Sequence, residues 1–272
     1  MKTKRSVYLI LWIGIITSSA FAQETITTSD IGTFTTVEKQ YSNSTVDGYN
    51  LYVPKSCTAT SASFPVIVFL QGGLGVGGDV DVIYGWGLPK TLKDPSHLNK
   101  ELKKLITDTF VIVMPHTDGG QFYSNEKAIQ TILKEVASNT NVDANRIYLT
   151  GLSFGGHGTW GLGSRIPETF AAIAPICGRA NGISDYTTLA SLPIWNSHNT
   201  GDSRVNYSIS QRIISQLEAT GISFHNTSSI ASTNYKKYDH IFTSTKSESH
   251  DAWTEMYNDP NLYKWFLKYT KE

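Results

Sequence analysis

Cysteine is scarce in this chain, with two among 272 residues. Cys57 and Cys177 are too few for a disulfide framework, and their spacing matches no metal-binding pattern. An exported protein could pair them, but the sequence does not show that their Cα atoms come close enough for a bridge. We therefore predict no bound metal, and the pairing of the two cysteines stays open.

An excess of positive charge is also lacking, because 23 Lys and Arg residues balance 23 Asp and Glu residues. Three of the basic residues, Lys2, Lys4 and Arg5, lie in a predicted leader that contains no acidic residue. Without this leader, 20 basic residues remain against 23 acidic ones, so the net charge becomes −3. The charge therefore gives no reason to expect a nucleic acid or an anionic membrane as partner.

A hydrophobic run long enough to cross a membrane, about 18 residues or more, is missing as well. The apolar residues 7–16 are preceded by a basic start and followed by Ala-Phe-Ala at residues 20–22. This pattern is typical of a secretory signal peptide cleaved after Ala22. We expect a secreted or periplasmic protein in which residues 23–272 form one domain, a length that suits a single large α/β fold.

Strand and helix patterns alternate along the rest of the chain. Continuous apolar segments, typical of strands covered on both faces, occur at residues 64–70, 110–114, 146–150, 170–174 and 192–196. Residues 34–41 and 49–53 alternate like an edge hairpin, and residues 235–241 form a weaker strand pattern. Helical patterns occupy residues 126–138, 154–165, 205–219 and 260–269. This order predicts a mixed, mostly parallel, doubly wound sheet with helices on both faces.

The sequence Gly-Leu-Ser-Phe-Gly at residues 151–155 lies between a predicted strand and a predicted helix. In a nucleophile elbow, the residues two before and two after the serine crowd each other, so glycine is needed at both places. The helix that follows directs free N–H groups toward the site, where they can stabilise an oxyanion. We predict Ser153 as nucleophile and the Phe154 N–H as one oxyanion donor. A glycine-rich turn with an incidental serine is the alternative.

A second glycine-rich stretch, residues 71–78, follows the first buried strand directly. From Gly73 it matches the G-x-G-x-x-G pattern of dinucleotide-binding proteins. However, no amphipathic helix opens at Gly78, and the next strand ends in Pro115 and His116 rather than in an acidic residue for a ribose. We interpret the stretch as the other half of an oxyanion hole, with the backbone N–H of Gly73 as donor and that of Leu74 as the next choice.

A serine nucleophile needs a histidine base, which in turn needs a carboxylate. In a hydrolase of this type the order along the chain is serine, acid, histidine, with each residue after a successive strand. Asp202 follows the fifth buried strand, and His250 lies between the last strand and the last helix. They are the predicted acid and base, although Asp202 could simply cap the helix that begins near Val205.

Other acids and histidines compete for these roles. Asp185 sits in a longer connection, and His240 ends the weak strand, one loop too early. His198 and His157 are interpreted as structural residues. The remaining histidines have no supporting context: His97, His116 and His225.

Taken together, these residues resemble α/β-hydrolases of the dienelactone-hydrolase and carboxylesterase-like group, including secreted "predicted peptidases", poly(3-hydroxybutyrate)-depolymerase-like esterases and feruloyl and acetyl-xylan esterases. The resemblance covers nearly all of residues 23–272. It is carried by Phe-Leu-Gln-Gly-Gly (69–73), Gly-Leu-Pro-Lys (87–90), Gly-Leu-Ser-Phe-Gly-Gly-His-Gly-Thr-Trp (151–160), Ala-Pro-Ile-Cys-Gly (174–178), Asp202 and His-Asp-Ala-Trp (250–253). One departure is Gln71, where the family usually has histidine.

The resemblance implies a serine esterase that needs no cofactor and acts on a small-molecule or polysaccharide-linked ester. Residues 175–191 are too few for the helical lid of a typical lipase, so we expect an open site. Aromatic residues that could stack on a sugar or an aryl acid are Trp86, Trp253, Phe122 and Tyr123. A peptidase, a polyester depolymerase and a non-catalytic binding module remain alternatives.

Overall fold

A ten-stranded mixed sheet runs through residues 22–58 and 62–271, which the computed structural model describes. The predicted signal peptide falls almost wholly on residues 1–21, outside the described residues. The strand order is β1-β2-β3-β5-β4-β6-β7-β8-β10-β9. Strands β1, β2, β3 and β5 are joined by antiparallel pairs, and every pair from β5 to β9 is parallel.

The strands of the sheet are β1 (Gln23–Thr28), β2 (Gly32–Glu38), β3 (Val46–Pro54), β4 (Phe64–Leu70), β5 (Val111–Thr117), β6 (Val142–Leu152), β7 (Ala172–Ile176), β8 (Ile194–Asn199), β9 (His225–Thr227) and β10 (His240–Thr245). Every residue of β4, β5, β7 and β8 is buried. The apolar sequences of β4 and β7 and of the first part of β5 reflect this position, because helices cover both faces of the parallel part of the sheet. In β8 and at the end of β5 the buried residues include polar ones such as Asn196, His198 and His116.

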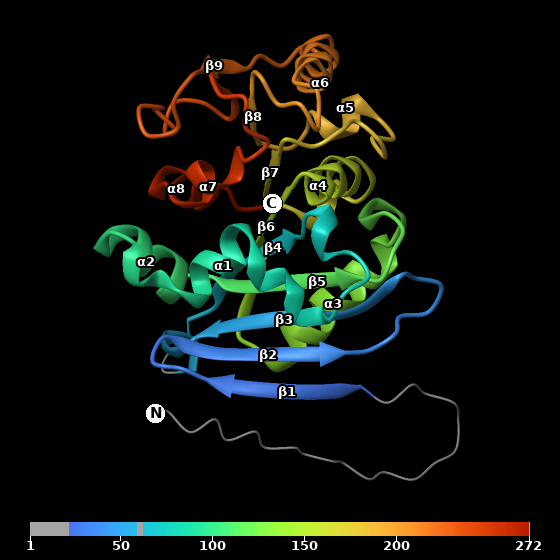
Figure 1. Cartoon of the computed structure of the whole chain (residues 1–272), viewed down its shortest axis with the longest axis vertical. Coiled ribbons are helices and arrows are strands. Elements are labelled where there is room, and N and C mark those ends of the chain that lie inside the picture. The colour runs from blue at the N-terminus through green and yellow to red at the C-terminus, as the bar shows by residue number, and fades with distance from the viewer. Residues whose placement is uncertain (1–21, 59–61, 272) are drawn as a thin grey trace.

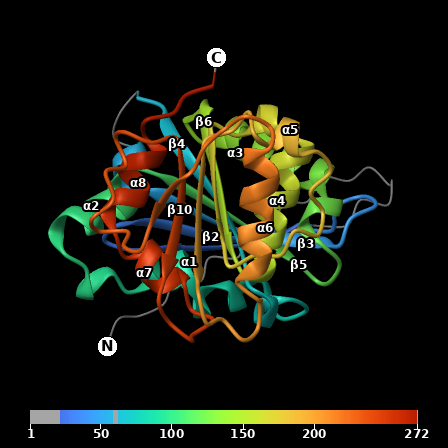
Figure 2. The ribbon, with the colours of Figure 1, turned by 90° about the horizontal axis from the view of Figure 1, so that it is seen from above.

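Helices form a layer on each side of the sheet (Figure 1; Figure 2). On one side lie α3 (Glu126–Asn139), α4 (Phe154–Arg165), α5 (Tyr186–Leu189) and α6 (Ser208–Glu218). On the other side lie α1 (Gly87–Lys93), α2 (Lys100–Asp108), α7 (Trp253–Tyr257) and α8 (Pro260–Phe266). Each layer encloses its own hydrophobic core against the sheet, as expected for a doubly wound fold.

The predicted elements are confirmed, but the structure also contains elements that were not predicted: β1, β9, α1, α2, α5 and α7. The hairpin of β2 and β3 exists, but β1 pairs outside it and forms the sheet edge. All six residues of β1 are exposed, so this strand lacks the half-buried alternation that identifies a strand in a sequence. The weak strand expected at residues 235–241 lies a few residues later, as β10.

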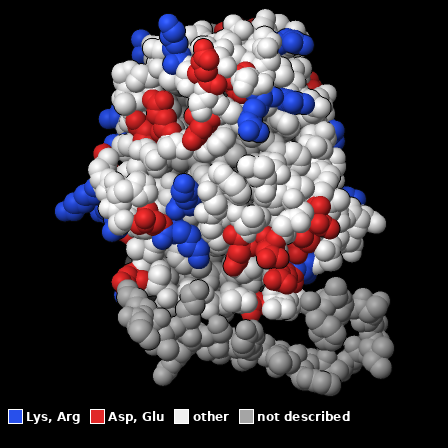
Figure 3. All heavy atoms as spheres, in the orientation of Figure 1, with Lys and Arg blue, Asp and Glu red and all other residues white. Residues whose placement is uncertain are grey.

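Charged side chains of both signs are interspersed on the face of the molecule drawn in Figure 3. Among the described residues on that face, no broad area carries only positive charge. No helix formed by residues 22–58 and 62–271 has the length and apolar character needed to cross a membrane.

Replacing Gly151 with alanine should destabilise the fold at the junction of β6 and α4. A Cβ atom at this position would lie 2.6 Å from the backbone C and O atoms of Gly155 and 2.8 Å from the Leu70 Cβ. Overpacking of this kind typically costs about 1–3 kcal/mol, which lowers Tm by roughly 2–4 °C per kcal/mol for a protein of this size. Thermal unfolding followed by circular dichroism measures the effect.

Gly119→Ala is the matched control, because a Cβ at Gly119 would have no atom within 4 Å. The two variants should differ clearly in Tm. Equal Tm values would contradict the prediction, because they would show that the structure accommodates a Cβ atom at Gly151 without cost.

Candidate active site

Ser153 stands at the sharp turn between β6 and α4. Its backbone has φ 53° and ψ −109°, a conformation that residues other than glycine rarely adopt. The neighbours must be small, since a Cβ on Gly155 would lie 2.0 Å from the carbonyl oxygen of Leu70 in β4. The backbone therefore has the geometry of the predicted nucleophile elbow, with the Ser153 side chain at the C-terminal edge of the central strands.

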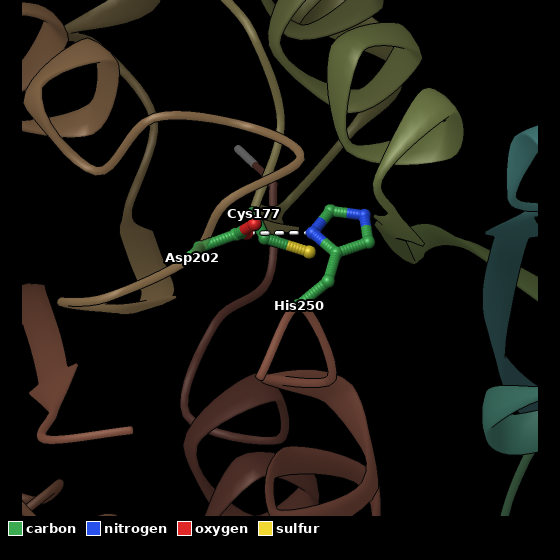
Figure 4. Close-up of side chains that lie close together, drawn as sticks. All are labelled: Cys177, Asp202 and His250. Atoms are coloured by element: carbon green, nitrogen blue, oxygen red, sulfur yellow. Dashed lines mark hydrogen bonds and ion pairs between the residues drawn. The ribbon is translucent and has the colours of Figure 1, made fainter. Parts of the chain in front are cut away.

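The structure brings the three predicted triad residues together. The Nε2 atom of His250 lies 2.9 Å from the Ser153 Oγ, and its Nδ1 lies 2.6 Å from the Asp202 Oδ2. Figure 4 shows the Nδ1 side of the imidazole facing Asp202 and the other nitrogen pointing away from it. With Nδ1 donating its proton to the carboxylate, Nε2 is the free acceptor for the serine proton.

Asp202 is almost fully buried and remains a carboxylate. Burial by itself would raise its pKa. The hydrogen bond from His250 and those from the backbone N–H groups of Val205 and Arg204 outweigh burial and hold the pKa of Asp202 below its usual value. The capping role considered for Asp202 is thus also present, because Oδ1 accepts the two N–H groups while Oδ2 faces His250.

A second histidine contacts the same carboxylate. The Nε2 atom of His198 lies 3.2 Å from the Asp202 Oδ2 and donates to the Val205 carbonyl at 2.9 Å, while its Nδ1 pairs with the Ser210 hydroxyl. Burial lowers the pKa of His198, although the Val205 carbonyl and Asp202 act in the opposite direction. A neutral His198 protonated on Nε2 satisfies all of these contacts. Interpreting His198 as structural missed its contact with Asp202.

Asn199 links the acid loop to the histidine loop. Its side-chain amide donates to the carbonyl groups of Ser249 and Asp251, at 2.9 Å and 3.1 Å, which flank His250. These bonds fix the position of the His250 backbone relative to the end of β8. No sequence pattern marks this role, because it depends on a contact across 50 residues.

The two predicted oxyanion donors lie next to each other. A Cβ built on Gly73 would be 3.7 Å from the Cβ of Phe154. Within the described residues, neither backbone N–H donates to another backbone carbonyl outside its own helix. Leu74, the second choice as donor, has a largely exposed side chain. Two free N–H groups beside a serine hydroxyl are the arrangement that can receive a developing oxyanion.

Hydrogen bonds from the side chains of Gln71 and His116 hold the loop that carries Gly73. The Gln71 amide donates to the Gly75 carbonyl at 2.7 Å, and the His116 Nε2 lies 2.9 Å from the same oxygen. On the other side of its ring, the His116 Nδ1 lies 2.6 Å from an oxygen of Asp47. Gln71 thus anchors the loop through its side chain, and His116, which had no supporting context in the sequence, takes part in the same network.

A cavity of about 410 Å³ opens beside Ser153, within the size range of small-molecule sites. Trp86 and Trp253 line it, as predicted, and the Trp253 ring packs edge-on against His250 with centroids 5.3 Å apart. Phe122 and Tyr123 do not line this cavity. Phe122 is fully buried beneath Phe154, and Tyr123 packs against Gly161 and Gly182 on the outer side of α4. Their placement at the site is therefore corrected, since both follow β5 and turn away toward α4.

Cys177 lies close to the triad and is a free, fully buried thiol, as Cys57 is also unpaired and buried. The Cys177 Sγ and donor atoms of Asp202 and His250 lie within 4.8 Å of one another (Figure 4). Burial raises the pKa of Cys177 strongly, which disfavours the thiolate that binds metals. Both nitrogens of His250 already face Ser153 and Asp202. We therefore interpret the cluster as a catalytic triad with a neighbouring thiol rather than as a metal site.

His116 should make stability depend on pH. Burial alone would lower its pKa, but Asp47 and the Gly75 carbonyl outweigh burial and raise the pKa of His116 above its usual value. A raised pKa means that the stabilisation is complete below about pH 6.5 and is lost as pH rises through the pKa of the folded state. Asp47→Asn should reduce the free energy of unfolding by about 1.5–3 kcal/mol at low pH and by less at high pH.

Urea unfolding at several pH values between 5 and 9 tests this expectation. The exposed Asp30, which has no side-chain hydrogen bond in the described residues, provides the control variant Asp30→Asn. A loss of stability in Asp47→Asn that is equal at every pH would contradict the assignment of His116 as the titrating group.

Comparisons with known proteins bear on the fold of the chain. No family model matches the chain. Residues of the chain are 30% identical over 107 positions to the "Bifunctional acetylxylan esterase/xylanase XynS20E" of Neocallimastix patriciarum, covering 37% of this chain and 16% of that protein. The chain thus spans about a sixth of the length of this relative.

Several solved structures share the fold. A thermostable esterase superposes with a TM-score of 0.64 at 20% identity, over 92% of this chain and 63% of that one. The S-formylglutathione hydrolase of Agrobacterium tumefaciens superposes with a TM-score of 0.61 at 13% identity, over 89% of this chain and 97% of that one. The acetyl xylan esterase of Aspergillus awamori superposes with a TM-score of 0.53 at 16% identity, over 70% of this chain and 80% of that one. The chain therefore has the α/β-hydrolase fold of these esterases, and the resemblance inferred from its motifs is confirmed at the level of the fold.

Proposed function

We propose that this protein is a serine hydrolase that cleaves carboxylic esters, with Ser153 as nucleophile, His250 as general base and Asp202 as the acid that orients it. The observation that carries the proposal is the continuous chain of hydrogen bonds from the Ser153 Oγ through His250 to Asp202, at 2.9 Å and 2.6 Å. These are the distances that a nucleophile, its base and the orienting group need for proton transfer.

The reaction follows from the geometry. The Ser153 oxygen attacks the ester carbonyl while its proton passes to the His250 Nε2, and Asp202 stabilises the imidazolium through Nδ1 without taking the proton. The N–H groups of Gly73 and Phe154 bind the tetrahedral oxyanion, and each donor of this kind is typically worth ~3 kcal/mol. His250 then protonates the departing alcohol. Water attacks the acyl-enzyme by the same steps, and the acid leaves.

Acyl or aryl esters attached to carbohydrate are the substrate class that we favour. The partial match to an acetylxylan esterase/xylanase supports this class. Trp86 and Trp253 line the cavity with flat aromatic surfaces, which pack well against sugar or aryl rings. Between β7 and β8 the only helix is α5, of four residues, so a bulky polymer-borne ester has access. Export through a leader ending at Ala22 fits a substrate outside the cell.

Ser153→Ala should abolish ester hydrolysis and leave the fold intact. Removing a triad nucleophile typically lowers kcat by about 10⁴-fold or more. Replacing Ser153 should leave Tm nearly unchanged, because alanine adopts the same strained backbone at the same cost and only the hydrogen bond between the Ser153 Oγ and His250 is lost. Turnover of 4-nitrophenyl acetate and thermal unfolding measure the two effects. Ser138→Ala, on the exposed end of α3, is the matched control.

Labelling with a fluorophosphonate gives an independent result. A mass increase on the peptide that contains Ser153, absent in Ser153→Ala, is expected. If the folded wild-type protein is not labelled, the hydrolase proposal is wrong, and a non-catalytic binding protein is the better interpretation of the fold.

A panel of acetylated xylo-oligosaccharides, methyl ferulate, a polyester oligomer and a peptide anilide separates the substrate classes. We expect the highest kcat/KM on a carbohydrate or aryl ester. Preferred cleavage of the anilide would identify a peptidase instead, and preferred cleavage of the polyester would identify a depolymerase.

A further inference from the structure

Two arginines line the cavity beside Ser153, and neither was expected there from the sequence. Arg179 follows β7 and Arg204 follows β8, two residues beyond Asp202. Because β6, β7 and β8 are adjacent and parallel, the loops at their C-terminal ends lie side by side at the edge that holds Ser153. The topology of the sheet thus places both positive charges next to the nucleophile.

Among the residues that the structure describes, no acidic one lines this cavity. Apart from Ser153, its other lining groups are His157, His250, Trp86 and Trp253, together with aliphatic residues, Phe154 and glycines. Two carboxylates next to lining residues in the sequence make other contacts. Asp202 is bound to His250, and Asp251 accepts hydrogen bonds from the N–H groups of Trp253 and Thr254 and from the Thr254 hydroxyl.

Neither arginine forms an ion pair with a carboxylate of the described residues. Other arginines of the protein do so: Arg146 binds Asp143 at 2.7 Å, and Arg165 binds Glu126 at 3.1 Å. Arg179 also lines a smaller cavity next to the first, together with Arg212, which likewise has no ion pair in the described part of the chain. The unpaired guanidinium groups are therefore gathered around the site and its immediate neighbour.

His157 reports the electrostatic effect of this arrangement. It follows the elbow on α4, and burial together with the positive charges of Arg179 and His250 lowers its pKa to about 4. Its Nε2 is buried and has no hydrogen-bond partner among the described residues. Unbalanced positive charge beside an apolar cavity wall attracts anions, since the field is focused where water is partly excluded.

We propose that the site takes esters whose non-reacting part carries a carboxylate, and that Arg179 and Arg204 bind this carboxylate beside the reacting carbonyl. The planar guanidinium group matches a carboxylate with two parallel hydrogen bonds, which fixes orientation as well as charge. The inference rests on the proposed ester hydrolysis and names its substrate class. The carboxylate belongs either to an acidic sugar that bears the ester or to the acyl group, as in a monoester of a dicarboxylic acid.

Matched substrate pairs distinguish these two sources. In the first pair, an O-acetylated methyl glucuronide is compared with the corresponding O-acetylated methyl glucoside. In the second, 4-nitrophenyl hydrogen glutarate is compared with 4-nitrophenyl pentanoate. The measured quantity is the ratio of kcat/KM for the charged member to that for the neutral member. A preference in the first pair identifies the acidic sugar, and a preference in the second identifies the acid group of the acyl part.

Wild-type protein should prefer the charged member of one pair by about tenfold, the size expected of a charge-assisted hydrogen bond. The ratio should fall toward one in Arg179→Gln and Arg204→Gln. It should also fall at 0.5 M salt, where the screening length is shorter than at physiological salt. Arg146→Gln is the matched control, because it removes the same charge in the N-terminal half of β6, whereas Ser153 follows the C-terminal end of this strand. Its ratio should equal that of the wild type.

Two results would overturn the inference. One is a ratio near one for both pairs in the wild type, with neutral esters turned over normally, which leaves the ester hydrolase proposal standing. The other is an equal fall of the ratio in Arg146→Gln, which shows a general effect of net charge.

A binding measurement keeps the inference testable even if no ester is hydrolysed. In Ser153→Ala protein, glucuronate or glutarate should raise the pKa of His157, followed by NMR, because a bound carboxylate offsets the charge of Arg179. Glucose should not do so, and the shift should be lost in Ser153→Ala/Arg179→Gln. An unchanged pKa of His157 with both anions would refute an anion site at Arg179.

Discussion

The hydrogen bond between Asp202 and His250 is the interaction on which the site depends, because it joins loops from two parts of the sheet into one geometry. The carboxylate is buried and is held by the N–H groups of Val205 and Arg204 as well as by His250. A buried charge is tolerated only when such partners satisfy it. His198 contacts the same oxygen, and Asn199 fixes the backbone on either side of His250. Two residues at the end of β8 therefore hold both the loop that carries Asp202 and the loop that carries His250.

The elbow at Ser153 and the Gly73 loop are held in position in two different ways. At Ser153 the backbone is forced into a strained turn, and the packing of Gly155 against Leu70 leaves no room for relaxation. Next to the elbow, the Gly73 loop is held by the side chains of Gln71 and His116, which both bind the Gly75 carbonyl. Of the two proposed oxyanion donors, Phe154 is thus positioned by close packing of the backbone and Gly73 by buried polar groups. Donors held in place before a substrate arrives are what electrostatic stabilisation of a transition state requires.

Much of this could be predicted because the signals are local. The buried strands have continuous apolar sequences, and the elbow has glycine at both crowded positions, since each pattern reflects contacts within a few residues or one side-chain period. The roles that were missed depend on how side chains are placed in the folded chain. His198 is only four residues from Asp202, but no sequence pattern shows that Asp202 turns back toward its imidazole, and the Asn199 amide reaches a loop 50 residues away. Phe122 and Tyr123 were misplaced for the same reason, since adjacency to a strand end does not tell on which side of the following helix a ring will pack.

The sequence by itself determined the alternation of strands and helices, the position of the elbow, and the order of serine, acid and histidine along the chain. These depend on side-chain size, hydrophobicity and backbone freedom, which are properties of each residue and its neighbours. Only the tertiary structure decided which arginines line the cavity with Ser153. Arg179 and Arg204 are 25 positions apart in the chain, and they become neighbours of Ser153 because parallel strands end at one edge of the sheet.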